Sequence, residues 1–429
     1  MIRLQTIPFA PGVARGVVTP STTGIPNRIS LVRPSDLEGL SGRPAGLIVI
    51  DGAPLSHPMI RILGLGVPTV IVSEAQAREL PSDHPLWIDG SSGLVCDSED
   101  LMSQPGRTAE TRPHGPYRMA DGTEIALNAS VASIDDAARA KSLGANAIGL
   151  VRSEGLLLEE PLPPDAGWFR TRFDRLVRAA APLPVTVRLI DFAADKRPSW
   201  LGEIAGSSGP IGLQGSRLYG EPAVRRILEA ELEGLAALTE PGVAEVLVPY
   251  LVFPEDFIAI RRRVAAVLGK DIVIGAMIET PGAAFDIAQW LEIADFVSIG
   301  CNDLMQCLFA ADRDIPELTS WLDPHAPGLF RFLRYMLSQA EDEVTRVRLC
   351  GLLPQMPSVL PILIGLGGRR FTAAPGVIPY LADAAAHTNL GDAQGLAERV
   401  CSAASAREVR SQLGLPAMPA WERRDLAAD

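Results

Sequence analysis

The sequence predicts an α/β protein in which a small α/β domain is followed by a (β/α)8 barrel. Three observations lead to this fold class. Short β-like runs alternate with helical stretches in residues 1–97, repeated strand–helix units follow from about Ile125, and two apolar runs of that second region end in acidic residues. At 429 residues the chain is long enough for two or three domains, one of them a barrel of roughly 250 residues or more.

The composition limits the partners that the protein can have. A hydrophobic content of 47% supports large buried cores, and a formal net charge of −12 argues against nucleic acid as the main partner. Arginine dominates the basic residues, so any anion site is expected to use bidentate guanidinium groups.

The sequence also predicts a cytoplasmic protein. Its five cysteines form no CxxC pair and no zinc-like spacing, which suits a reducing compartment. The first residues, MIRLQTIPFAPGV, lack the basic and apolar regions of a signal peptide. The most apolar stretch, residues 349–368, is interrupted by three prolines, so no membrane span is expected.

Three regions follow one another along the chain. Residues 1–97 contain the short runs GVARGVV, RISLV, AGLIVI, TVIVS, LWID and GLVCD and are predicted to form the small domain. Residues 98–118 are polar and interrupted by prolines, which is typical of a linker. Residues 119–429 are predicted to form the barrel and C-terminal helices, the last of them in the Ala-rich stretch 382–413.

The barrel region contains nine candidate strands, one more than a (β/α)8 barrel needs. They are EIALNA, AIGLVR, VTVRLID, GLQGSR, EVLVPYL, IVIGAMIE, FVSIG, VRLCGLL and FTAAPG. A doubly wound sheet is the competing architecture, but the expected glycine-rich nucleotide turn is not found, and GLGGRR at 365–370 is too weak a fragment to count.

Two acidic residues mark a candidate metal site. Glu279 ends the run VIGAMIE and Asp303 follows the run FVSIG. Carboxylates at the carboxyl ends of parallel strands share one rim of a barrel, where Mg²⁺ and substrates are usually bound. The alternative is that Glu279 caps a helix and Asp303 belongs to a turn.

One histidine is a candidate nucleophile. His57 lies in DGAPLSHPMIRILGLGVPTV (residues 51–70), where it follows a strand and a turn and begins an apolar helix. A neutral imidazole, with an ordinary pKa of about 6.5, can accept a phosphoryl group without a separate base. A histidine in this position can equally be a helix cap.

The segment from Ile278 to Arg313 resembles the signature of the phosphoenolpyruvate-utilising enzymes, a family that includes enzyme I of the sugar phosphotransferase system, pyruvate phosphate dikinase and phosphoenolpyruvate synthase. The surroundings of His57 resemble the phosphohistidine swivel domain of the same family, whose usual form is GG-x-x-SH followed by an apolar helix. The opening FAPGVARGVV is similar to the start of that domain. Two departures are Pro54 and Leu55, where the family has residues that help to orient the phosphoryl group.

The same resemblance implies roles for residues of the barrel, which would be a TIM barrel. Four arginines match the family's clamp for phosphate and carboxylate: Arg152 in GLVRSEGLLL, Arg188 in VTVRLIDFAADK, Arg217 in IGLQGSR and Arg313 in AADRD. Glu279 and Asp303 would hold Mg²⁺, Asn302 would contact the phosphate, and Cys350 in RLCGLLP would protonate C3 of the enolate. From the residues alone, each arginine could form a surface salt bridge and Cys350 could be a small core residue.

This chain also departs from the family in the barrel. Residues 352–356, which follow Cys350 and Gly351, read LLPQM where the family has acidic residues and glycine in CGEMAGD. The first arginine of the family's WRAIR is Gln214, and its GGDK is AADK at 193–196. These changes concern proton transfer and the polarity of the pocket.

The resemblance implies Mg²⁺-dependent phosphotransfer between phosphoenolpyruvate or pyruvate and His57. Residues 1–97 hold no helical insert for docking a phosphocarrier, and no ATP-grasp domain precedes them, so we expect a separate phosphocarrier protein or ATP-grasp subunit as partner. Relatives commonly dimerise through the barrel, which implies a homodimer. The alternatives are a degenerate sensor of phosphoenolpyruvate and an enzyme that acts on a related 2-oxo acid or enol phosphate.

Overall fold

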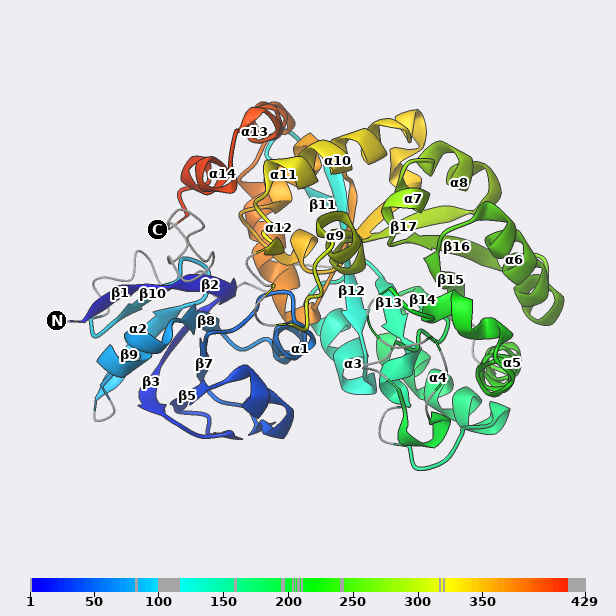
Figure 1. The fold of residues 1–429 in the computed structure, drawn as a ribbon, viewed down its shortest axis with the longest axis horizontal. Helices are drawn as coiled ribbons and strands as arrows, with labels where there is room; N and C mark the ends of the chain where they lie inside the picture. Colours follow the sequence, from blue (N-terminus) through cyan, green and yellow to red (C-terminus); the bar gives the residue numbers. More distant parts are fainter. Residues whose placement is uncertain are drawn as a thin grey trace.

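The computed structural model describes residues 2–81, 84–98, 116–157, 160–193, 197–202, 204, 206, 209, 211–239, 243–315, 318 and 321–415, and only the backbone of Glu38, His57 and Arg61. Two units lie side by side, the N-terminal one drawn in blue and the second in cyan to red (Figure 1). No helix among these residues is long and apolar enough to cross a membrane.

The N-terminal unit is built on a mixed eight-stranded sheet. Its strand order is β1 (Arg3–Gln5), β10 (Leu94–Cys96), β9 (Pro85–Asp89), β3 (Val13–Thr19), β5 (Arg28–Val32), β7 (Gly46–Ile50), β8 (Thr69–Val72) and β2 (Ile7–Ala10). The central pairs β3–β5, β5–β7 and β7–β8 are parallel, and the other pairs are antiparallel. Helix α1 (His57–Leu65) crosses between β7 and β8, while α2 (Glu74–Glu79) follows β8. Two short strands, β4 (Thr23–Gly24) and β6 (Ser41–Gly42), form a separate pair.

The second unit is an eight-stranded parallel barrel. Its strands are β12 (Glu124–Val131), β13 (Ile148–Arg152), β14 (Val185–Arg188), β15 (Val243–Leu251), β16 (Val273–Ile278), β17 (Phe296–Gly300), β18 (Val347–Cys350) and β19 (Arg370–Ala373). Each pairs in parallel with the next, and β19 closes the barrel by pairing with β12. Strand β11 (Tyr117–Arg118) pairs antiparallel with β12. The predicted fold class is therefore confirmed.

Helices surround the barrel in chain order (Figure 1). They are α3 (Ile134–Ser142), α4 (Ala166–Ala180), α5 (Pro222–Ala236), α6 (Pro254–Leu268), α7 (Pro281–Ala284), α8 (Ile287–Ile293), α9 (Cys301–Phe309), α10 (Pro327–Ser338), α11 (Leu360–Gly365) and α12 (Ile378–Ala386), followed by α13 (Leu390–Ser402) and α14 (Ala406–Gln412). Most begin with a cap or with proline in the first turn; Asp165, for example, accepts a hydrogen bond from the backbone N–H of Trp168.

One of the nine candidate strands is wrong. GLQGSR at 212–217 leads into a 3₁₀ helix, η6 (Gly215–Gly220), instead of a barrel strand. Gly215 has φ of 52°, a left-handed conformation that turns the chain away from the extended direction at this point. The predicted linker, 98–118, lies largely outside the described residues, and its last two residues form β11.

Helix α1 packs against the barrel. Arg139 of α3 donates hydrogen bonds to the carbonyl oxygens of Gly64 at 2.9 Å and Leu65 at 3.4 Å, at the C-terminal end of α1. Gly66 adopts φ of 60° there, and a Cβ at this position would lie 2.6 Å from the Arg139 guanidinium. These contacts fix the C-terminal end of α1 against α3 of the barrel.

A buried carboxyl group lies between α5 and β14. Glu231 is fully buried, and one of its oxygens accepts a hydrogen bond from the backbone N–H of Ile190 at 3.0 Å. Burial raises the pKa of Glu231 to about 8. The folded protein therefore binds a proton between about pH 4.5 and 8 that the unfolded chain has released.

This excess proton makes the free energy of unfolding decrease as pH rises through that window, by up to about 1.4 kcal/mol per pH unit. Glu231→Gln keeps an acceptor for Ile190 and cannot ionise. We expect the variant to match the native protein at pH 5 and to exceed its stability at pH 8, as measured by denaturant unfolding. The same pH dependence in both proteins would contradict the assignment.

Candidate functional site

A cavity of about 810 Å³ opens at the carboxyl ends of the barrel strands. Its polar lining comes from β12, α3, β13, β14, β18, β19 and the segments that follow β16, β17 and β18: Ser130, Asp136, Arg152, Arg188, Glu279, Asn302, Asp303, Arg313, Cys350, Gln355 and Thr372. Ile60 and Gly64 of α1 also line it. The cavity is therefore bounded by both units of the fold.

Seven of the nine predicted site residues line this cavity. They are the three arginines 152, 188 and 313, together with Asn302, Cys350, Glu279 and Asp303. His57 begins α1, but its side chain lies outside the described part of the structure. Arg217 is not among the lining residues; it is exposed and its guanidinium carbon lies 5.1 Å from the centre of the Tyr250 ring.

Arg188 is the most strongly paired cation of the site. It is buried at the end of β14 and forms ion pairs with Glu154 and, at 2.9 Å, with Asp191. The two carboxylates raise its pKa above the ordinary value, against the opposing effect of burial. Its Nε has no hydrogen-bond partner among the described residues, so one donor of the guanidinium remains for an anion.

Arg152 differs from Arg188 in its surroundings. Burial lowers its pKa, with Glu154 acting in the opposite direction and Arg188 in the same one. Its Nε also has no hydrogen-bond partner within the described ranges. Two neighbouring guanidinium groups with donors available fit a ligand that carries several negative charges.

Asp303 and Arg313 are joined by the turn that follows α9. The Arg313 guanidinium lies 3.3 Å from Asp303 Oδ1. Gln306 fixes this turn, since its side-chain oxygen accepts a hydrogen bond from the backbone N–H of Arg313 at 3.0 Å. Asp303 is thus paired with the Arg313 cation, and it also lines the same cavity as Glu279.

Glu279 has the chemistry of a cation ligand. It is 2% exposed, and its Oε2 accepts a hydrogen bond from the backbone N–H of Tyr250 at 3.0 Å. Gly300 is required beside it, because a Cβ there would overlap Oε1. Burial raises the pKa of Glu279, and the nearby Asp303 raises it further. A bound divalent cation would relieve this charge repulsion, and two carboxylates are few enough ligands to leave room for water and a phosphate around Mg²⁺.

Cys350 ends β18 as a buried thiol. Its sulfur lies 3.4 Å from the carbonyl oxygen of Ile299 and accepts a hydrogen bond from Ser298 Oγ at 3.7 Å. Burial raises the pKa of Cys350 to about 12, with Glu279 adding to the effect. The group is therefore a thiol at neutral pH and can donate a proton.

The loop after Cys350 is held by amide side chains. Asn302 Oδ1 accepts a hydrogen bond from the backbone N–H of Leu352 at 2.8 Å. Gln355 donates to the carbonyl oxygen of Gly351 at 2.9 Å and accepts from the backbone N–H of Ala374 at 2.8 Å. The loop is thereby tied to the segments that follow β17 and β19.

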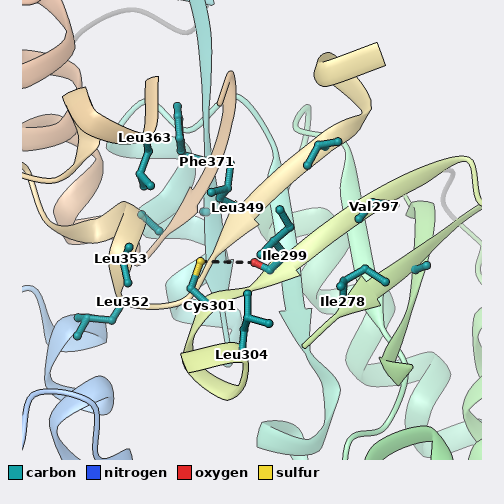
Figure 2. Close-up of a cluster of buried hydrophobic side chains, with 14 of the residues drawn as sticks. Ile278, Val297, Ile299, Cys301, Leu304, Leu349, Leu352, Leu353, Leu363 and Phe371 are labelled. Atoms are coloured by element: carbon teal, nitrogen blue, oxygen red, sulfur yellow. Dashed lines mark hydrogen bonds between the residues drawn. The ribbon is translucent and has the colours of Figure 1, made fainter. Parts of the chain in front are cut away.

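The apolar residues of this loop are not part of the lining of the cavity at the strand ends. Leu352 and Met356 line a second cavity, whose described wall also includes Ile7, Phe9, Pro54 and His325. Figure 2 shows Leu352 and Leu353 on the loop, beside the packed core of Leu349, Ile299 and Phe371. Leu352, which departs from the family, thus lines the second cavity and not the cavity at the strand ends.

Several residues of the site were not predicted as such. Glu154 and Asp191 are the ion-pair partners of Arg188. Each lies two or three residues after an arginine at a predicted strand end, in the motifs GLVRSEGLLL and VTVRLIDFAADK, so the sequence could have indicated both as site residues. Ser298 lies on a predicted strand two residues before its end. Tyr250, at the end of β15, carried no polar signal in the sequence.

A parallel barrel whose carboxyl rim gathers three arginines, three acidic residues and a thiol is suited to binding an anion together with a cation. Comparison with known proteins agrees. The model described as PEP-utilising enzyme, PEP-binding domain, matches residues 107–390, and that described as PEP-utilising enzyme, mobile domain, matches residues 30–93.

The curated relatives carry related names. A phosphoenolpyruvate-protein phosphotransferase of Haloferax volcanii is 30% identical over 408 residues, covering 89% of this chain and 70% of the relative. One of Streptomyces coelicolor is 30% identical over 85% of this chain and 67% of the relative. A multiphosphoryl transfer protein of Xanthomonas campestris pv. campestris is 30% identical over 85% of this chain, which spans 46% of that protein.

The chain belongs to the phosphoenolpyruvate-utilising enzyme family and is a phosphotransferase of that family. The resemblance noted in the segment from Ile278 to Arg313 and around His57 is thereby confirmed. The family typically uses Mg²⁺, and the donor set at Glu279 and Asp303 fits such an ion.

The state of the Cys350 thiol can be tested directly. Because it is 3% exposed and its pKa is raised to about 12, iodoacetamide should leave Cys350 unmodified in the folded protein at pH 8. Cys307, which is half-buried, should react faster and serves as an internal reference. Peptide mass mapping would measure both; rapid alkylation of Cys350 would show an accessible thiolate instead.

Proposed function

We propose that this protein catalyses Mg²⁺-dependent phosphoryl transfer between phosphoenolpyruvate and His57, with pyruvate as the other product. The main support is one arrangement: arginines, carboxylates and a buried thiol line a single cavity, and the helix that begins at His57 forms part of its wall. A separate chain, either a phosphocarrier or an ATP-grasp subunit, would exchange the phosphoryl group with His57.

The arginines would bind and orient the substrate. Phosphoenolpyruvate carries a phosphate and a carboxylate, and guanidinium groups bind both through paired hydrogen bonds. Arg188 is fixed by Glu154 and Asp191, so its donors are pre-positioned and need little reorganisation when charge moves during the reaction.

Phosphoryl transfer would proceed from the enol oxygen of phosphoenolpyruvate to an imidazole nitrogen of His57. A nitrogen of His57 forms a bond to phosphorus while the bond between phosphorus and the enol oxygen breaks, which leaves an enolate. Residues of α1 and of the barrel both line the cavity, so the two units would together shield the reacting groups from water. A Mg²⁺ ion held by Glu279 and Asp303 would supply positive charge to the phosphate and enolate oxygens.

Cys350 would complete the reaction as proton donor. Its thiol, protonated because of the raised pKa, gives its proton to C3 of the enolate and pyruvate is formed. Ser298 donates a hydrogen bond to the sulfur and would stabilise the thiolate that remains until solvent restores the proton.

A second candidate is a protein that binds phosphoenolpyruvate without turning it over. The changes at Pro54, Leu55 and Leu352 favour it, since the family has polar or acidic residues there. A less polar ligand in the barrel has weaker support, because Leu352 and Met356 line the second cavity instead of the catalytic one.

Phosphorylation of His57 separates the two candidates. Incubation with phosphoenolpyruvate and Mg²⁺ should add the mass of one phosphoryl group, and mild acid should remove it because phosphoramidates hydrolyse in acid. Intact mass spectrometry would measure both steps. His57→Ala should abolish the gain, whereas His387→Ala, which alters an exposed histidine after α12, should retain it. No added mass in the native protein would favour the binding protein.

Cation and substrate should bind together. Glu279→Gln combined with Asp303→Asn should remove Mg²⁺-dependent binding of phosphoenolpyruvate in calorimetry, because two ligands of the ion are lost. Asp271→Asn is the matched control, since this exposed carboxylate lies before β16, at the opposite end from Glu279. Binding that is unchanged in the double variant would remove the metal assignment.

A further inference from the structure

Tyr250 has an unusual backbone conformation beside the site. It lies in β15 one residue before the end of the strand and has φ of 50°, in the left-handed region. This conformation is unfavourable for a residue with a bulky side chain, and such residues are concentrated at functional sites. The backbone N–H of Tyr250 donates to Glu279 Oε2 at 3.0 Å, and its carbonyl oxygen accepts from Ser216 Oγ at 3.0 Å.

The neighbouring segment is shaped around this residue. Gly215 is also left-handed, with φ of 52°. A Cβ at Gly215 would lie 2.5 Å from Tyr250 Cβ and 3.0 Å from Asp191 Oδ1. The absence of a side chain at 215 is therefore what lets Tyr250 pack between η6 and the end of β15.

The side chain of Tyr250 contacts Arg217 of η6, Gln214 at the N-cap of η6 and Cys307 of α9. The Arg217 guanidinium lies over the ring, 5.1 Å from its centre, and donates longer hydrogen bonds to the carbonyl oxygens of Ile211 and Gly212 at 3.4 and 3.5 Å. The Tyr250 hydroxyl is hydrogen-bonded to the side chain of Gln214, and also to the thiol of Cys307.

Tyr250 thus joins two groups with separate proposed tasks. Its backbone fixes one oxygen of Glu279, which is a proposed cation ligand, and its ring supports Arg217, which is a proposed substrate ligand outside the cavity lining. Gln214 stands where the family has an arginine, so Arg217 is the cation of this motif that remains. The position of this guanidinium then depends on the ring beneath it.

We propose that Tyr250 is a positioning residue that holds Glu279 ready for Mg²⁺ through its backbone and Arg217 ready for phosphoenolpyruvate through its ring. The inference rests on the proposed function and adds a residue that neither the resemblance nor the strand-end pattern indicates. The two tasks belong to different parts of one residue, so substitutions can separate them.

Three variants make this separation, measured by calorimetric titration with Mg²⁺ and with phosphoenolpyruvate. Tyr250→Gly keeps the N–H and accepts the left-handed backbone, so Mg²⁺ affinity should stay near the native value. It removes the ring, and phosphoenolpyruvate should bind about tenfold more weakly because Arg217 loses a cation–π contact. Tyr250→Ala should show the same loss and in addition bind Mg²⁺ about tenfold more weakly, because alanine keeps the unfavourable left-handed backbone but lacks the packed ring that holds it in place.

Tyr250→Phe provides the matched control. It keeps the ring under Arg217 and loses only the hydroxyl contacts, so phosphoenolpyruvate affinity should recover most of what the glycine variant loses. Glycine and alanine variants that bind both ligands as the native protein does would overturn the inference.

The titrations do not depend on turnover, so they distinguish this inference from the proposed function. A native protein that binds both ligands and forms no phosphohistidine would refute the function, while the variants would still decide the role of Tyr250. If the native protein is phosphorylated and the variants bind both ligands with native affinity, the proposed function is supported and the role of Tyr250 is refuted. A native protein that binds neither ligand would overturn both.

Discussion

The cavity at the carboxyl ends of the barrel strands depends on the buried ion pairs of Arg188. A guanidinium group with 4% exposure is stable only because Glu154 and Asp191 compensate its charge. Removing either carboxylate would leave a buried charge with incomplete compensation, which is more costly than losing a surface pair. The same pairs fix the direction of the guanidinium, so stability of the rim and orientation of its donors have one physical origin.

The two carboxylates Glu279 and Asp303 are less well compensated by positive charge than Arg188 is by negative charge. Asp303 has Arg313 at 3.3 Å, whereas Glu279 is held by a neutral backbone N–H. Burial next to Asp303 therefore raises the pKa of Glu279. A site that keeps two carboxylates together at this cost is suited to a divalent cation, since a monovalent partner such as one arginine neutralises only one of them.

Much of this arrangement could be predicted from the sequence, because parallel strands end at a common rim. Eight of nine candidate strands are correct, and their ends carry seven of the nine predicted site residues into one cavity. The failures have local causes. GLQGSR has the apolar start of a strand, but the left-handed Gly215 turns the chain into η6. Tyr250 was missed because its contribution comes from its backbone conformation and its ring, neither of which a pattern of polar residues reveals.

The loop after Cys350 shows how a departure in sequence can leave a site intact. Leu352 occupies a position where the family has an acidic residue, yet its backbone N–H is bound by Asn302, and Gln355 ties Gly351 to Ala374. These contacts use backbone groups, so they are insensitive to the side chain at 352. The thiol of Cys350 contacts Ser298 and Ile299 on the neighbouring strand β17, away from position 352. The substitutions at Leu352 and Met356 therefore act on the surface behind the loop, where the barrel meets the N-terminal unit.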